Sequence, residues 1–266
     1  MMHDEAPTAD ALPPLPESLL KQLATVRSVG VITGAGISAE SGIRTYRGSG
    51  GVYDDPEEGD RTIEALTGST LIADPDRTWR TLAALASQAL TAEPNAGHHA
   101  LVEIERKVHR FVLLTQNVDG LHRAAGSTNM IEIHGHLLDT LCLACGKEDT
   151  FTREQVAALT ATPRCECGAG LRPRVVLFDE MLDHRKVRQL QRELIEQPPD
   201  LVLAVGTTGL FPYIAAPMVE AARARHLTVE VNPEVTMLTR WARFHLPGGA
   251  GHYLPLIAAA IPGSPR

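Results

Sequence analysis

The sequence predicts an α/β fold in which a parallel sheet is covered by helices on both faces, with a small zinc-binding domain inserted into it. Two observations carry this prediction. Short apolar segments that end at glycine or polar residues alternate with helical patterns, as in parallel sheets buried on both faces. Residues 139–180 break this alternation and contain all four cysteines.

The expected strands are short and apolar, whereas the expected helices are longer and amphipathic. Asp74 is placed to cap a helix that starts at Pro75, a residue favoured at the first helical position. Loose tails are expected at residues 1–14 and 261–266. The expected strands are 28–33, 110–115, 130–133, 201–205 and 227–231, and the expected helices are 15–26, 75–91, 96–107, 184–196 and 212–225.

Length and composition are those of an ordinary globular protein. The 266 residues allow one or two domains. With 44% apolar and 21% charged residues, the chain is not a disordered chain, a collagen or a coiled coil. Its 25 basic and 32 acidic residues give a net charge of −7, which argues against a basic nucleic-acid surface. We expect no direct nucleic-acid partner, and the sequence carries no signal for the oligomeric state.

The N-terminus and the cysteines favour a cytoplasmic protein without a membrane partner. The first 17 residues are acidic and proline-rich, and they lack the basic start and apolar stretch of a secretory signal. No apolar run approaches the roughly 20 residues that span a bilayer. Four cysteines in one short window are typical of metal or redox chemistry in a reducing compartment.

A glycine-rich loop follows the first expected strand. Gly34, Gly36 and Ala39 match the pattern G-x-G-x-x-G/A, in which glycine lets the backbone approach a pyrophosphate. A plain tight turn is an equally good interpretation of the loop alone. An acidic residue about 20 positions further on would bind ribose in a dehydrogenase. Asp54 and Asp55 are near that distance, but no expected strand leads into them, which argues against an ordinary dehydrogenase fold.

Polar residues also follow the strands 110–115 and 130–133. Gln116, Asn117 and Asp119 come where ligands bind in open α/β sheets, although Asn117 or Asp119 could equally cap a helix. His134 follows the next strand beside a glycine and is a candidate general base. The remaining candidates fit helix faces or exposed positions better: His98, His99, His109, His122 and His136.

The cysteines form two close pairs that predict a metal site. Cys142 and Cys145 are separated by two residues, and Cys165 and Cys167 by one. Four thiolates suit a tetrahedral zinc ion, and because they leave no position for water, the zinc is expected to be structural. The second pair departs from the usual C-x-x-C spacing. A redox site is the alternative, but it needs one pair only.

Together these segments resemble the sirtuin family, the NAD-dependent protein lysine deacylases. The resemblance extends over about residues 15–260, with the motifs in the family's order. Besides the cysteine pairs, the matching segments are GAGISAESGIRTYRG (34–48), PNAGHHAL (94–101), TQNVDGLHRAAGS (115–127), IHG (133–135), LRPRVVLFDE (171–180), VGTT (205–208) and EVNPE (230–234).

The resemblance implies a fold and an activity. It implies a Rossmann-like NAD-binding domain over 15–138 and 181–260, a small zinc-binding domain over 139–180, and a substrate cleft between them. The implied reaction removes acyl groups from protein lysines with NAD as co-substrate, giving nicotinamide and O-acyl-ADP-ribose. An acylated lysine in a protein or peptide is the implied partner.

The resemblance also assigns roles to residues. His134 matches the catalytic base, and Asn117 and Asp119 are implied to be catalytic as part of the nicotinamide pocket. Val176, Leu177, Phe178, Asp179 and Glu180 are implied to pair with the substrate backbone as an added strand. The residues implied to bind NAD are Gly34, Ala35, Gly36, Tyr46, Arg47, Gln116, Asn117, Val118, Asp119, Gly206, Thr207, Thr208, Asn232, Glu234 and Ala250.

Three departures from the family pattern bear on specificity. Arg44 stands where the cofactor loop commonly has proline, which loosens the backbone. Asp179 replaces the glycine of Phe-Gly-Glu and either alters how a peptide lies or adds charge that selects basic peptides. Leu82 and Leu85 align with the Tyr and Arg of desuccinylating sirtuins. Because leucines offer no cation to a carboxylate, we expect neutral acyl groups, acetyl or longer.

Two rival functions remain on the same scaffold. An NAD glycohydrolase or mono-ADP-ribosyltransferase would also expel nicotinamide, so Asn117 and Asp119 do not distinguish it from a deacylase. The presence of His134 argues against this rival, because deacylation needs a base. A non-catalytic NAD sensor is the second rival, and the retention of the whole polar set argues against it.

Overall fold

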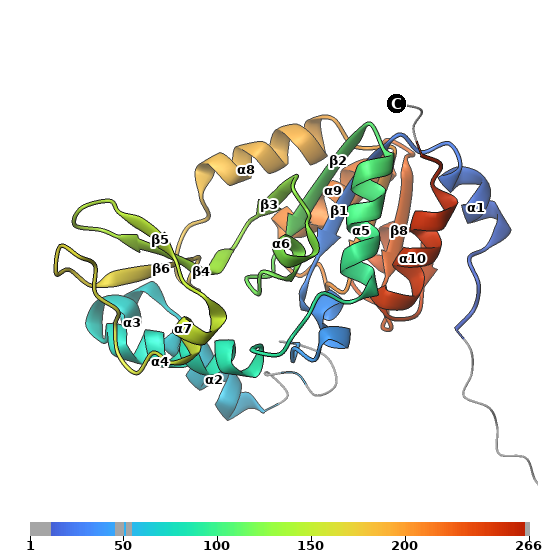
Figure 1. Cartoon of the computed structure of the whole chain (residues 1–266). Helices are drawn as coiled ribbons and strands as arrows, with labels where there is room; N and C mark the ends of the chain where they lie inside the picture. Colours follow the sequence, from blue (N-terminus) through green and yellow to red (C-terminus); the bar gives the residue numbers. More distant parts are fainter. Residues whose placement is uncertain (1–11, 46–50, 52–54, 264–266) are drawn as a thin grey trace, which may run out of the picture.

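Six parallel strands form the main sheet of the protein, which a computed structural model describes for residues 12–45, 51 and 55–263 (Figure 1). Neighbouring strands follow the order β3-β2-β1-β7-β8-β9, which is the order of a doubly wound dinucleotide-binding sheet. The predicted fold class is therefore confirmed. The strands are β1 (Ser28–Thr33), β2 (Arg110–Thr115), β3 (Met130–Glu132), β7 (Leu201–Val205), β8 (Leu227–Val231) and β9 (Phe244–Leu246).

Helices cover both faces of this sheet (Figure 1). Successive side chains of a strand point to opposite faces, so Val31 packs with one group of helices and Ile32 with the other. One face is covered by α1 (Glu17–Leu23), α5 (Ala96–Lys107) and α10 (Ala250–Ala260). The other face is covered by α8 (His184–Leu190), the π-helix η3 (Gln191–Glu196) and α9 (Pro212–Arg223).

Local signals explain most boundaries of the predicted elements. The side chain of Asp74 accepts a hydrogen bond from the Arg77 amide at 3.1 Å, and Pro75 begins α4 (Pro75–Gln88), as expected. Asn95 caps α5 in the same way. Four of the five expected strands have the predicted bounds, and β3 ends one residue early at Glu132. Four elements were not predicted from the sequence, namely α10, α2 (Pro56–Ala65), α3 (Gly68–Ala73) and the short edge strand β9.

A second, antiparallel sheet lies beside the first, at the other end of the molecule from α1 (Figure 1). Its strands, in the order β5-β4-β6, are β5 (Glu148–Thr150), β4 (Gly135–Cys142) and β6 (Leu171–Val175). Helix α7 (Arg153–Ala157) follows β5. Trp79 and Leu82 of α4 belong to the same apolar cluster as Leu137 and Cys142, so the core of this sheet extends beyond residues 139–180.

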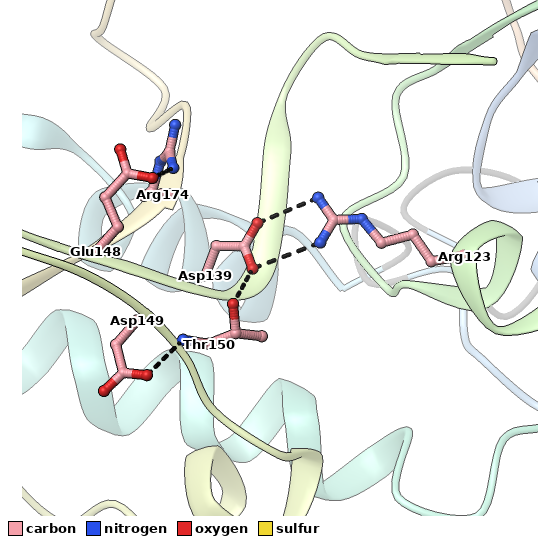
Figure 2. A pocket seen from close by; sticks show the side chains of 6 residues that line it. All are labelled: Arg123, Asp139, Glu148, Asp149, Thr150 and Arg174. Carbon is pink, nitrogen blue, oxygen red and sulfur yellow. Dashed lines mark hydrogen bonds and ion pairs between the residues drawn. The ribbon is translucent and has the colours of Figure 1, made fainter. Parts of the chain in front are cut away.

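Two arginines connect the sheets. Arg123, from α6 (Leu121–Ala125), pairs with Glu132 at the end of β3 and with Asp139 on β4, where Nη2 lies 3.1 Å from Oδ2. Figure 2 shows Arg123 and Thr150 directed at the same Asp139 carboxylate, beside a surface cavity of about 480 Å³. Arg153 of α7 donates to the main-chain oxygens of Ala89, Ala92 and Asp119. The small sheet is thus bonded to loops of the large one.

Candidate active site

The polar residues singled out in the sequence follow five strands of the parallel sheet. Gly34 follows β1, Gln116 follows β2, His134 follows β3, Gly206 follows β7 and Asn232 follows β8. Because the strands are parallel, their carboxyl ends meet at one edge of the sheet. The structure therefore brings together residues that lie up to about 200 positions apart in the chain.

Glycine is required at this edge because two loops touch there. The Gly36 amide donates to the Gly206 carbonyl at 2.9 Å, and a Cβ on Gly36 would lie 2.6 Å from the Gly206 Cα. Gly34 has an extended backbone, with φ of −125°, and leads into the 3-10 helix η1 (Ala35–Ser41). This contact between the two loops leaves no room for a side chain at Gly36.

Gln116, Thr207 and Asn232 link the ends of β2, β7 and β8, with β1 between the first two strands. Gln116 Nε2 donates to Thr207 Oγ1 at 2.8 Å, and Asn232 Nδ2 donates to the Thr207 carbonyl at 3.3 Å. The Glu234 amide in turn donates to Asn232 Oδ1 at 3.2 Å. These bonds fix the side chains before any ligand arrives. Thr208 is exposed beside this group, and Ala250 is buried at the first position of α10.

Asn117 and Asp119 form a chain of hydrogen bonds with Ser38. Asn117 Nδ2 donates to Ser38 Oγ at 3.2 Å, and Ser38 Oγ donates to Asp119 Oδ2 at 2.7 Å. The other oxygen of Asp119 accepts the Leu121 amide at the start of α6. Asp119 thus contacts Ser38 through one oxygen and the start of α6 through the other, although the N-cap residue of α6 is Gly120. Ser38 was not predicted as a site residue, although it lies within the motif 34–48.

Val118 lies between the two sheets. Its carbonyl accepts the Leu137 amide of β4 at 3.0 Å, and its side chain packs against the apolar cluster of the small sheet. The backbone of the expected nicotinamide pocket is thus shared between the two parts of the fold.

His134 is held by both ring nitrogens. Nδ1 lies 3.1 Å from the Gln116 carbonyl, and because a carbonyl only accepts, Nδ1 carries the proton of the neutral ring. Nε2 lies 2.8 Å from the hydroxyl of Tyr213. Burial lowers the pKa of His134, opposed by the Gln116 carbonyl and assisted by the positive charge of Lys186. A general base requires a neutral imidazole with one unprotonated nitrogen, whose lone pair can accept a proton.

Of the other histidine candidates, His98 and His122 lie on helices, as expected, whereas His136 lies on strand β4, where it was not expected. His98, His122 and His136 are all buried. His98 Nδ1 accepts the Asn95 amide at 3.3 Å, and His122 Nε2 lies 3.0 Å from Thr33 Oγ1. These polar rings can be buried because each has a hydrogen-bonding or charged neighbour, which for His136 is Asp139.

The cysteines converge as a tetrad. Their four sulfur atoms lie within 4.8 Å of one another, with the pairs Cys142–Cys167 at 3.5 Å and Cys145–Cys165 at 3.6 Å. Four sulfurs bound to one zinc at about 2.3 Å would be about 3.8 Å apart, so the arrangement fits the ion. The C-x-C spacing of the second pair does not prevent convergence. The tetrad is positioned to bind a structural zinc.

Comparison with known proteins identifies the family. A model of the Sir2 family matches residues 34–211. The chain is 43% identical over 235 residues to NAD-dependent protein deacylase 2 of Pseudomonas aeruginosa, covering 87% of this chain and 91% of the relative. It is 38% identical to the NAD-dependent protein deacylase of Thermus thermophilus, covering 94% and 95%. This chain belongs to the Sir2 family.

Solved Sir2 structures share its fold. A Sir2 homologue in complex with NAD superimposes with a TM-score of 0.80 at 33% identity, covering 95% of this chain and 96% of the other. A mutant Sir2 homologue in complex with 2′-O-acetyl-ADP-ribose gives a TM-score of 0.79 at 33% identity, covering 93% and 96%.

The expected substrate segment of this Sir2 protein is anchored within the chain. The amide of Val176 donates to the His134 carbonyl, that of Leu177 to Glu180, and that of Phe178 to the Leu66 carbonyl. Asp179 accepts from the amides of Gly68 and Ser69 at the start of α3, and these bonds lower the pKa of its carboxyl group. The Asp179 carboxylate is thus bonded to the first amides of α3.

The expected cofactor loop of this Sir2 protein is described in part. Tyr46 and Arg47 lie outside the described residues. Arg44, which stands at the family's proline position, pairs with Glu58 of α2 at 3.1 Å, so its side chain is tied to a helix. Among the described residues, no helix combines the length and apolarity that crossing a membrane would require.

Proposed function

We propose that this Sir2 protein removes neutral acyl groups from protein lysines with NAD as co-substrate. The observation that carries the proposal is the half-buried His134, which is fixed at the strand edge by its Gln116 and Tyr213 contacts, beside the Asn117–Ser38–Asp119 chain. The Sir2 relatives are named as NAD-dependent protein deacylases, which supports the same activity. The cysteine tetrad favours a reducing compartment, for which we propose the cytoplasm.

Each group at the strand edge has a chemical task in this proposal. NAD supplies, when bound, a ribose carbon that accepts the acyl oxygen as nicotinamide leaves. Asn117 and Asp119 hold the nicotinamide end in place, and His134 takes a proton at Nε2. The tetrad keeps the small sheet folded and takes no part in the reaction.

The residues that we propose to bind other parts of NAD follow different strands of the sheet. We assign phosphate contacts to the loop of Gly34, Ala35 and Gly36, and ribose contacts to Gln116. The residues that we propose to complete the NAD site are Tyr46, Arg47, Val118, Gly206, Thr207, Thr208, Asn232, Glu234 and Ala250. Val176 to Glu180 would flank the substrate backbone, and because the amides of residues 176–178 are already bonded, recognition there would fall to side chains and carbonyl oxygens.

The preference for neutral acyl groups rests on α4. Leu82 is buried and Leu85 partly buried in the apolar cluster against which Val118 packs. Neither leucine can neutralise a carboxylate, so a succinyl or malonyl group near this cluster would be desolvated without a partner.

The deciding experiment measures nicotinamide release from NAD by mass spectrometry, with no peptide, an acetyl-lysine peptide or its succinyl analogue. We expect release with the acetyl peptide only, together with O-acetyl-ADP-ribose. His134→Gln should bind NAD and lose 10²–10⁴-fold in rate, the usual contribution of a general base. Release without peptide would identify a glycohydrolase, and equal turnover of both peptides would contradict the acyl preference.

A further inference from the structure

Tyr213 contacts the proposed base directly, and neither its sequence context nor the proposed mechanism explains why. Its hydroxyl lies 2.8 Å from Nε2 of His134, the nitrogen that carries the free electron pair when Nδ1 donates to the Gln116 carbonyl. In the neutral ring Nε2 can only accept, so the phenol donates to it. The atom that must receive a proton in the reaction is therefore already bonded to Tyr213.

Tyr213 is held in this position by its surroundings. It is the second residue of α9, directly after Pro212, whose ring fixes the backbone at the start of the helix. Its ring stacks on Phe211, with centroids 5.4 Å apart and planes inclined by 15°. Both aromatic rings meet the His134 imidazole edge to face. Displacing the hydroxyl from Nε2 would disturb this three-ring packing.

We propose that Tyr213 relays the proton between the substrate hydroxyl and Nε2 of His134. The proposal rests on the assignment of His134 as the base. A substrate hydroxyl at the phenol oxygen gives its proton to that oxygen while the phenol proton moves to Nε2. One O–H bond forms on Tyr213 as another breaks, so tyrosine is regenerated, the substrate oxygen becomes negative and the imidazole becomes a cation. Nε2–H then donates to the phenol oxygen.

The charged state gains more from this contact than the neutral one. A hydrogen bond from the imidazolium is charge-assisted and about twice as strong as that of the neutral ring. Tyr213 therefore stabilises protonated His134 and opposes the effect of burial, which lowers the pKa of His134 and raises that of Tyr213. The other groups facing the ring are the Gln116 carbonyl at the end of β2 and Lys186 of α8, whose charge opposes protonation.

The test compares Tyr213→Phe with the wild type in the free protein and in turnover. In the free protein, NMR titration of the His134 ring nitrogens should show a lower pKa in Tyr213→Phe, because the charge-assisted bond is lost. In turnover, kcat should fall about 10- to 100-fold, since water replaces the hydroxyl only in part, while KM for NAD and peptide stays within about twofold. The acidic limb of the kcat profile should move to lower pH.

Tyr253→Phe is the matched control, because its buried hydroxyl has no hydrogen-bond partner among the described residues. It should behave as the wild type, and equal melting temperatures would exclude misfolding. An unchanged or higher kcat in Tyr213→Phe would overturn the relay and show that the phenol only covers Nε2. An unchanged His134 titration would overturn the contact itself. If His134→Gln stays active, the proposed function fails, which the titration distinguishes from failure of the relay.

Discussion

The imidazole rings of His98 and His122 pack against each other, with centroids 4.8 Å apart. Burial is the main cause that lowers the pKa of His98 to about 4 and that of His122 to about 3. Both rings are therefore neutral at pH 7, which lets His122 contact Thr33 and His98 accept from Asn95. The unfolded chain protonates both residues near pH 6.5 and the folded chain does not, so the free energy of unfolding decreases as the pH falls below this value.

This decrease predicts sensitivity to mild acid. As the pH falls from 7 to 5, each of the two histidines should remove about 2 kcal/mol from the free energy of unfolding, because only the unfolded state gains the proton. His122→Gln keeps a polar group near Thr33 but cannot titrate. Urea unfolding at pH 7 and pH 5 should therefore show a smaller loss in this variant than in the wild type. Equal losses in both proteins would contradict the assignment.

At the scale of single residues, the sequence predicted roles where a motif indicates the chemistry. It did not predict features that depend on which side chains are buried. The strand-end positions of Gln116, His134 and Asn232 followed from the pattern alone. Tyr213 gave no signal, because its role depends on how α9 meets β3 in space. His98 and His122 were expected on helix faces or in exposed positions, and sequence periodicity did not show that their side chains would be enclosed.

At the scale of elements, α3 and the segment 176–180 support each other. Asp179 binds the first amides of α3, and Phe178 donates to the Leu66 carbonyl just before that helix. Glu180 pairs with Arg172 of β6 at 2.9 Å. The segment proposed to meet the substrate is therefore ordered in advance, which lowers the entropic cost of binding a peptide.

Removing this anchor should weaken peptide binding selectively. Asp179→Ala should raise KM for the acetyl peptide several-fold, leave KM for NAD unchanged and increase hydrogen exchange at residues 66–69. Asp179→Asn, which retains an acceptor oxygen, should lie between this variant and the wild type. A greater loss for peptides with basic flanks would instead show that Asp179 faces the substrate.

The strands of the large sheet other than β9 were predictable because each is short, apolar and bounded by glycine or polar residues. The small sheet was not, because its strands are held by the tetrad and by α4 rather than by a pattern of their own. Packing between α4 and β4 joins segments some 50 residues apart, and no local signal reports it. For the same reason, the expected domain at 139–180 does not include α4, whose Trp79 and Leu82 share an apolar cluster with the small sheet.

At the scale of the whole molecule, zinc and the site are connected through the small sheet. Cys142 ends β4, and the same strand donates the Leu137 amide to Val118. Loss of the metal should therefore loosen the sheet and then the proposed nicotinamide pocket, because closed sites of this kind depend on the ion for folding.

Tryptophan fluorescence can locate this effect. The chain has two tryptophans, and Trp79 lies in the core of the small sheet with its indole nitrogen 2.9 Å from the Leu171 carbonyl. In Trp241→Phe, a strong chelator should shift the Trp79 emission to longer wavelength and abolish turnover. In Trp79→Phe, the emission of Trp241 should stay constant. Full activity after measured loss of zinc would contradict the structural role.

Arg153 limits how the small domain can be exchanged between related proteins. It extends from the helix after β5 and binds the main chain at Ala89, Ala92 and Asp119. A guanidinium that binds carbonyl oxygens depends on the path of the backbone and not on the side chains along it. A small domain transplanted from a relative would therefore tolerate many sequence differences in the recipient, but not an insertion between α4 and α5. Because Arg153 recognises the path of the main chain, chimeras should take the connection 89–95 from the same parent as α7.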